Sequence, residues 1–220
     1  MDAPALPHAA HAPLVQGEAL TVVKLGGSVI RSLQLTPWLD VIAAAPGPVI
    51  VVPGGGALAD EVRLCQRQLG FGDPVAHRMA LLAMDQLAWA VAGLRSGLEV
   101  GTTEDELRAI VGRGRVAVWA PYALVSSCTD IEATWRLTSD SLALWLAGQL
   151  GARHCSLIKS IQPPPGTVSA QGLAREGVVD GAFTAMLAET GVSATLFGSG
   201  DQQALAAFLA NEGASGTAIE

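Results

Sequence analysis

The sequence predicts an α/β protein in which helices cover both faces of a mainly parallel β-sheet. Half of the 220 residues are hydrophobic and 15% are charged, which is the composition of a folded domain with a buried core. Short β-branched runs alternate along the chain with longer segments rich in alanine and leucine. The β-branched runs are apolar throughout, which is typical of strands buried on both faces of a sheet.

In the first half of the chain, strands and helices alternate before a pair of consecutive helices. Leu20–Leu25 is a predicted strand because it is a β-branched run, and Leu35–Ala45 is a predicted helix because it is a longer apolar segment. The run PVIVVP at Pro48–Pro53 predicts a second buried strand. Helices are then expected over Leu58–Leu69 and Val75–Leu94, which are long segments rich in alanine and leucine.

The alternation continues to the end of the predicted domain. Thr102 or Thr103 is expected to cap a short helix, and Thr138 or Ser139 a longer one. Strands are predicted where apolar runs return between the helical segments. In chain order these elements are the helix Glu104–Val111, the strand Arg115–Trp119, the helix Ser139–Leu150, the strand Cys155–Lys159, the helix Asp180–Glu189, the strand Ala194–Phe197 and the helix Asp201–Ala210.

Length and charge bound the domain organisation and the class of partner. A single domain is expected over residues 19–210, with flexible tails at residues 1–18 and 211–220. The net charge of −7 and the pI near 5.0 argue against nucleic acid as a partner, because no basic stripe is present to neutralise phosphates. We therefore expect a small molecule as the partner.

The cysteines and the apolar segments indicate the compartment. Cys65, Cys128 and Cys155 are odd in number and far apart, which fits neither a disulfide framework nor a zinc site. The N-terminus lacks the basic and apolar regions of a signal peptide. The longest apolar run is interrupted by Asp85 and Gln86, which argues against a membrane span. These observations predict a soluble cytoplasmic protein.

Lysine is rare in this chain, and both lysines fall where strands are predicted to end. Of the 13 basic residues, 11 are arginine and only Lys24 and Lys159 are lysine. Ammonium and guanidinium groups are not interchangeable at a tight site, so lysines that persist against this bias point to a chemical requirement. Because open α/β sheets bind ligands at the carboxyl ends of their strands, we expect both ammonium groups near a ligand.

Glycine-rich loops follow the first two predicted strands. KLGGS at residues 24–28 and PGGG at residues 53–56 let backbone N–H groups approach an anion closely, at the start of a following helix. Neither loop has the Walker pattern or the GxGxxG pattern of dinucleotide folds. Each loop alone could be a simple turn, but two in succession, one carrying lysine, predict a phosphate site.

Asp140 lies in the first turn of the predicted helix Ser139–Leu150. A carboxylate at that position stabilises the helix dipole by about 0.3–1 kcal/mol, which is one explanation for it. The other explanation is that Asp140 orients ammonium groups across a site. The residues alone leave both open.

Together these motifs resemble the amino acid kinase superfamily, which includes aspartate, acetylglutamate, carbamate, uridylate and isopentenyl phosphate kinases. The resemblance runs from about Leu20 to Leu209 and includes TSDSLALWLAGQLGA and VVDGAFTAMLAETGV. It implies a three-layer αβα sandwich and phosphoryl transfer from ATP with Mg²⁺. It further implies that Lys24, Asp140 and Lys159 are catalytic, and that Gly26, Gly27, Ser28, Lys159 and Asp180 contact the nucleotide. No residue is assigned as a metal ligand.

The acceptor is expected to be a phosphate monoester. The substrate-binding residues are predicted to be Gly54, Gly55, Gly56, Arg63, His77, Trp135 and Thr138. Uridylate kinases carry aspartate where this chain has His77, and their loop after the strand-end lysine differs from Ser160-Ile-Gln-Pro-Pro-Pro.

AHRMA and TWRLTSDSLA resemble the methanofuran-pathway kinases that convert [5-(aminomethyl)furan-3-yl]methyl phosphate to its diphosphate. A uridylate or isopentenyl phosphate kinase, or a non-catalytic nucleotide- or oxyanion-binding protein, is the alternative.

The apolar circumference of Val75–Leu94 predicts a homo-oligomer, a dimer or higher.

Overall fold

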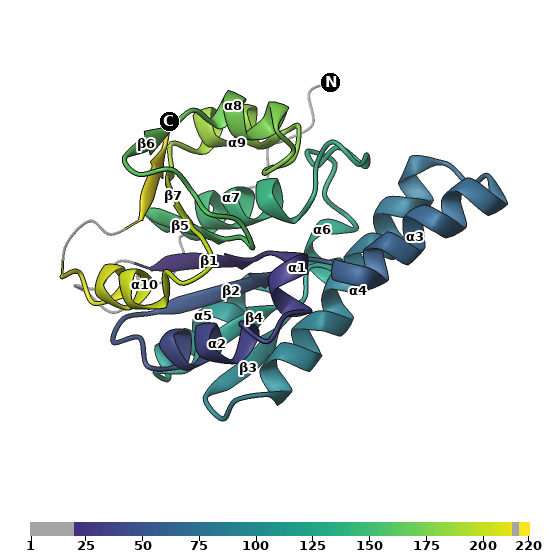
Figure 1. Cartoon of the computed structure of the whole chain (residues 1–220). Coiled ribbons are helices and arrows are strands. Elements are labelled where there is room, and N and C mark those ends of the chain that lie inside the picture. Colours follow the sequence, from purple (N-terminus) through teal and green to yellow (C-terminus); the bar gives the residue numbers. More distant parts are fainter. Residues whose placement is uncertain (1–19, 213–215) are drawn as a thin grey trace, which may run out of the picture.

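The computed structural model describes residues 20–212 and 216–220, which form a sheet with helices on both sides (Figure 1). The strand order is β3-β4-β2-β1-β5-β7-β8-β6, and every pair is parallel except β7 with β8. The strands are β1 (Thr21–Leu25), β2 (Val49–Pro53), β3 (Leu98–Gly101), β4 (Val116–Trp119), β5 (His154–Ile158), β6 (Thr167–Val168), β7 (Ser193–Phe197) and β8 (Thr217–Ile219). The predicted mainly parallel sheet is confirmed.

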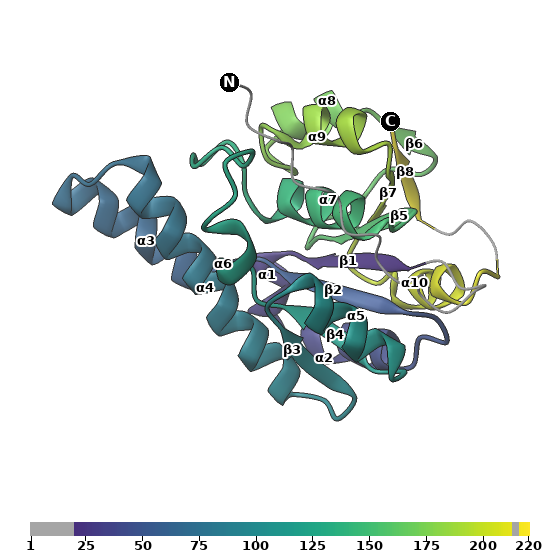
Figure 2. The same cartoon turned by 180° about the vertical axis from the view of Figure 1, so that it is seen from behind.

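The helices form the outer layers of an αβα arrangement. In Figure 1, α7, α8 and α9 lie above the sheet and α2 lies below it. The paired helices α3 and α4 project beyond the sheet in both views (Figure 1 and Figure 2). The helices are α1 (Gly27–Ile30), α2 (Leu35–Ala43), α3 (Gly56–Leu69), α4 (Asp73–Gly93), α5 (Glu104–Gly112), α6 (Tyr122–Val125), α7 (Ser139–Leu150), α8 (Ala170–Arg175), α9 (Phe183–Thr190) and α10 (Gln202–Leu209).

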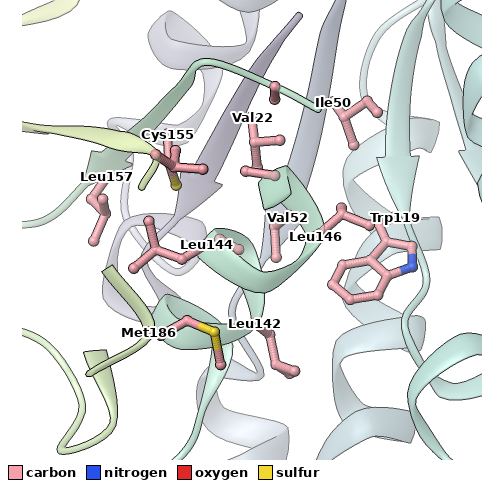
Figure 3. Close-up of a cluster of buried hydrophobic side chains, with 14 of the residues drawn as sticks. Val22, Ile50, Val52, Trp119, Leu142, Leu144, Leu146, Cys155, Leu157 and Met186 are labelled. Atoms are coloured by element: carbon pink, nitrogen blue, oxygen red, sulfur yellow. The ribbon is translucent and has the colours of Figure 1, made fainter. Parts of the chain in front are cut away.

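The hydrophobic core is divided into two clusters by the sheet, because successive strand residues point to opposite faces. Val22 of β1 packs in the cluster beneath α7, part of which is shown in Figure 3. Its neighbour Val23 packs in the other cluster, with Trp38 of α2 and Leu205 of α10. Both faces are therefore covered, which explains why β1 and β2 are buried along their whole length.

Several elements differ from the sequence prediction. The edge strand β3 was not predicted, because its short run LEVG contains a charged residue. The helix expected from Asp180 begins only at Phe183, because the Asp180 side chain accepts hydrogen bonds from other segments. Within the described residues, no helix is long and apolar enough to cross a membrane.

The expectation of a flexible tail over residues 211–220 is wrong at its end. Thr217–Ile219 forms β8, which pairs with both β7 and β6, and the side chains of Thr217 and Ile219 are buried. Burial of these two alternating residues explains why so short a run is held in the sheet. The expected tail at residues 1–18 lies outside the described residues.

Candidate active site

The two lysines lie on the same face of the sheet as α7 because of strand parity. Val22 and Lys24 are two residues apart on β1, and Val22 packs in the cluster beneath α7. Leu157 of β5 packs in that same cluster, and Lys159 follows it by two residues, directly after the strand. Parallel pairing places Lys24 opposite Leu157. Both lysine side chains therefore leave neighbouring strand ends toward the start of α7.

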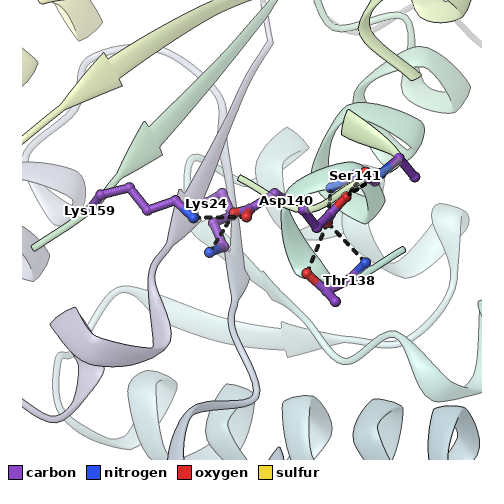
Figure 4. A network of polar contacts seen from close by, with 7 residues as sticks. Lys24, Thr138, Asp140, Ser141 and Lys159 are labelled. Atoms are coloured by element: carbon purple, nitrogen blue, oxygen red, sulfur yellow. Dashed lines mark hydrogen bonds and ion pairs between the residues drawn. The ribbon is translucent and has the colours of Figure 1, made fainter. Parts of the chain in front are cut away.

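Asp140, in the first turn of α7, contacts both ammonium groups (Figure 4). Lys24 Nζ lies 2.7 Å from Asp140 Oδ1, and Lys159 Nζ lies 2.8 Å from Asp140 Oδ2. Lys24 and Asp140 are 3% and 4% exposed, so this contact is almost completely removed from water. The residues predicted to be catalytic are thus brought together in one buried cluster.

The electrostatics of this cluster favour an anionic ligand. Burial raises the pKa of Asp140, but the positive charges of Lys24 and Lys159 outweigh burial and lower that pKa to about 2. Burial and the charge of Lys24 lower the pKa of Lys159 to about 8, although Asp140 opposes them. At pH 7 the cluster therefore holds two ammonium groups against one carboxylate. A phosphoryl group is an anion that could balance the remaining positive charge.

The carboxylate of Asp180 is hydrogen-bonded to the first residues of α7. Its Oδ2 accepts hydrogen bonds from the N–H and Oγ of Thr138, both at 2.9 Å, and from the N–H of Ser141 at 3.1 Å. Its Oδ1 accepts from the Ser141 hydroxyl and from the N–H of Ala182 at 3.2 Å. Thr138 is the N-cap residue of α7, as predicted, but its side chain makes no capping hydrogen bond to the helix, and Asp180 supplies the acceptor instead.

The two glycine loops touch each other beside the lysines. A Cβ atom at Gly27 would lie 2.8 Å from the Cα of Gly56, and one at Gly54 would lie 2.9 Å from the Gly27 nitrogen. Only glycine permits this approach of two backbones. The Gly26 N–H donates to the carbonyl of Ile158 and so ties the first loop to β5. The loops thus form one continuous surface of backbone at the carboxyl ends of β1 and β2.

A pocket of about 220 Å³ opens between this backbone surface and helices α3 and α4. It includes most of the residues predicted to bind phosphate or substrate, which are Gly27, Ser28, Gly54, Gly55, Gly56, Arg63, His77, Trp135 and Thr138. His77 is half-buried, and burial lowers its pKa, which favours the neutral form of the ring. The sequence prediction missed Arg31, Asp60 and Ser139, which also line the pocket.

Comparison with known proteins assigns the chain to a family. Residues 19–162 match the model of the amino acid kinase family. This chain belongs to the amino acid kinase family. The match includes both glycine loops and the three residues of the buried cluster, so the recognised motifs are the ones that the structure brings together.

Individual relatives are more distant. The chain is 25% identical over 135 residues to the [5-(aminomethyl)furan-3-yl]methyl phosphate kinase of Methanocaldococcus jannaschii. The aligned segment covers 60% of this chain and 62% of that relative. The uridylate kinase of Archaeoglobus fulgidus has a TM-score of 0.68 at 16% identity, covering 92% of this chain and 100% of that one. The aspartate kinase of Synechocystis has a TM-score of 0.63 at 15% identity, covering 91% of this chain and 39% of that one. These two structures confirm the fold of the amino acid kinase family.

Proposed function

We propose that this protein is a kinase that transfers the γ-phosphoryl group of ATP to a small phosphate monoester. The observation that carries the proposal is the buried contact of Lys24 and Lys159 with Asp140, directly beside the paired glycine loops. Such a site offers positive charge and backbone donors but requires no nucleophile on the protein. This is the requirement of phosphoryl transfer, which depends on positioning and charge stabilisation.

In this proposal each residue of the cluster has a distinct task. Lys24 and Lys159 neutralise charge on the transferred group, and their contribution increases as that charge spreads in the transition state. Asp140 fixes both ammonium groups from a helix start that is itself held by Asp180. No general base is required, because a phosphate acceptor already presents an anionic oxygen.

The residues present fit a bound nucleotide. Glycine at positions 27 and 54 lets the two loops pack backbone against backbone, and the N-terminal N–H groups of α3 have no partner within their own helix. ATP, when bound, would supply the phosphoryl group. Within residues 20–212 and 216–220 no group of three or more His, Cys, Asp or Glu side chains could hold a metal ion. We therefore propose that Mg²⁺ enters the site bound to the phosphates of the nucleotide, as this ion commonly does.

The acceptor that we propose is [5-(aminomethyl)furan-3-yl]methyl phosphate, which would be converted to its diphosphate. The support is the activity for which the Methanocaldococcus jannaschii relative is named, together with the flat ring of Trp135 and the cations Arg31 and Arg63 in the pocket. Uridine monophosphate is the alternative acceptor, favoured by the fold similarity to uridylate kinases but disfavoured by His77.

The test is ADP release from ATP and Mg²⁺ with a panel of acceptors, followed by mass spectrometry of the product. The panel contains the aminomethylfuran phosphate, its parent alcohol, uridine monophosphate and isopentenyl phosphate. We expect rapid turnover of the furan phosphate and none of the alcohol, which cannot pair the cationic pocket groups. Turnover of uridine monophosphate alone would identify a uridylate kinase. ADP release that no acceptor increases would show that the protein is not a kinase of this class, and nucleotide binding without turnover would show a non-catalytic protein.

Self-association is part of the proposal. The side chains of Val75, Leu82 and Trp89 recur every seven residues on α4 and are all exposed, Trp89 by 67%. Residues at this spacing share one face of a helix, so they form an apolar stripe. A second copy of the chain would cover this stripe in a dimer or a larger homo-oligomer.

A further inference from the structure

Asp60 is the only carboxylate among the described residues that line the pocket of the proposed acceptor. Arg31 and Arg63 line the same pocket and are suited to a phosphate. A carboxylate is not, because its charge repels the charge of a phosphate. The presence of Asp60 therefore calls for a positive group, either on the protein or on the ligand.

The contacts of Asp60 account for only one of its two carboxylate oxygens. Arg63 Nη1 donates a hydrogen bond of 3.0 Å to Asp60 Oδ1, whereas Oδ2 accepts none within the described part of the chain. The Asp60 side chain is 65% exposed, so Oδ2 is open to a ligand. One helical turn separates Asp60 from Gly56, which places it about 6 Å along α3 from the glycine loops.

The neighbours of Asp60 form a fixed wall. The Arg63 guanidinium lies 4.1 Å from the centroid of the Trp135 ring. Trp135 Nε1 donates a hydrogen bond of 2.6 Å to Gln66 Oε1, and Gln66 Nε2 donates one of 2.8 Å to Asp73 Oδ1. These contacts fix the plane of the tryptophan ring relative to α3. A flat acceptor lying between the glycine loops and this wall would present its far end to Asp60.

We infer that Asp60 binds an ammonium group of the acceptor, so that the pocket selects phosphate monoesters that also carry a primary amine. The inference rests on the proposed function, since it assumes that the phosphate lies at the glycine loops. The substrate named for the Methanocaldococcus jannaschii relative has this chemistry, with an aminomethyl group and a phosphate-bearing methyl group on different carbons of one ring. Such a molecule carries opposite charges at its two ends, which match Asp60 at one end and the glycine loops with Arg31 at the other.

A surface ion pair is the simpler explanation of the contact between Asp60 and Arg63. Exposed pairs spaced by three residues on a helix contribute little to stability, and their loss would affect every acceptor alike. A carboxylate that binds an ammonium group would instead matter only for acceptors that carry the amine. The two explanations are separated by changing the protein and the acceptor together.

The experiment measures kcat/KM for Asp60→Asn on two acceptors, the aminomethylfuran phosphate and its neutral hydroxymethyl counterpart. Asn keeps the shape of the side chain and removes the charge. The expected result is a loss of roughly tenfold for the amine-bearing acceptor, the lower end for a hydrogen bond between charged groups, and a change below twofold for the hydroxymethyl acceptor. Glu61→Gln is the matched control, since Glu61 is the neighbouring carboxylate on α3 and does not line the pocket, and it should leave both values unchanged.

Each other result has a defined meaning. An equal loss for both acceptors would overturn the inference and assign Asp60 to holding Arg63, and no loss for either would overturn it as well. Wild-type protein that turns over both acceptors equally would also overturn it, while leaving the proposed kinase intact. If the wild type turns over neither, the proposed acceptor is wrong. Calorimetry then decides the inference, which stands only if the amine-bearing phosphate binds the wild type about tenfold more tightly than Asp60→Asn.

Discussion

The buried position of Lys159 predicts that the protein becomes more stable as the pH rises above 8. The Lys159 side chain is only 14% exposed, and burial and the charge of Lys24 lower its pKa from 10.5 to about 8. Lys159→Met removes the charge and retains an unbranched side chain of similar length. Asp140 keeps Lys24 as a partner at 2.7 Å, so the variant does not leave the carboxylate unpaired.

The magnitude follows from the two pKa values. Below pH 8 the lysine is protonated in both the folded and the unfolded protein, and the folded state bears the full cost of the buried charge. Between pH 8 and 10.5 the folded protein has released this proton and the unfolded chain has not, so stability rises with pH. At 1.36 kcal/mol per pKa unit, the whole rise is about 3 kcal/mol.

The assay is urea unfolding of the wild type and of Lys159→Met at a series of pH values from 7 to 10.5. Titrating groups that do not contact Lys159 are common to both proteins and cancel in the difference between their free energies of unfolding. We expect the wild type to gain on the variant by about 3 kcal/mol across this range. Saturating inorganic phosphate should reduce the gain, because an anion favours the protonated lysine. A constant difference, or one that changes in the opposite direction, would refute the reasoning.

Further predictions concern activity, assembly and the support of α7. Lys24→Arg should lower kcat roughly 10²–10³-fold with little change in the KM for ATP in steady-state assays, because a guanidinium cannot replace a point charge beside the glycine loop. In the wild type, kcat/KM should fall as the pH rises through about 8, when Lys159 loses its proton, as a pH–rate profile would show. Asp180→Ala should destabilise the protein by about 1–3 kcal/mol in urea unfolding, because it removes the acceptor for the N–H groups that begin α7. Trp89→Glu should convert the oligomer to a monomer by light scattering, and a wild type that is already monomeric would contradict the proposed stripe.

The meeting of the two lysines could be predicted from the sequence because it depends on local features. Strand ends are visible as the ends of short apolar runs, one followed by Gly26 and the other by Ser160, and parallel strands bring their carboxyl ends to one side of the sheet. Lys24 and Lys159 each stand at such an end, and both contact Asp140 in the structure. The catalytic roles of these three residues stay predictions.

The far side of the pocket could not be predicted in the same way. Trp135 and Gln66 are 69 residues apart and meet only because the segment before α7 returns to α3. Asp60 carries a local signal, since it stands three residues before Arg63 and shares its helix face. A charged pair on a helix is ordinarily a solvated one, so this spacing alone does not indicate a ligand.

The function of Asp180 was also not visible in the sequence. The sequence predicts a helix that begins at Asp180, but the carboxylate of Asp180 accepts hydrogen bonds from Thr138 and Ser141, which are 42 and 39 residues away in the chain. Such contacts depend on the packing of α9 against α7, which no local pattern specifies. The strand β8 was missed for the same reason, since its short run enters the sheet only through pairing with β7 and β6.

The arrangement of the site explains how the fold tolerates an unfavourable cluster of charges. Two buried ammonium groups against one carboxylate destabilise the folded state, as the lowered pKa of Lys159 indicates. The cluster lies at the carboxyl ends of the strands, where α7 begins and the glycine loops meet. The strands β1 and β2 and most of β5 are buried in apolar packing. Folding stability therefore comes from the apolar packing along the strands, and the loops at their carboxyl ends are free to hold groups selected for chemistry. A site of this kind becomes favourable only when an anion arrives, so phosphate binding and folding stability should rise together.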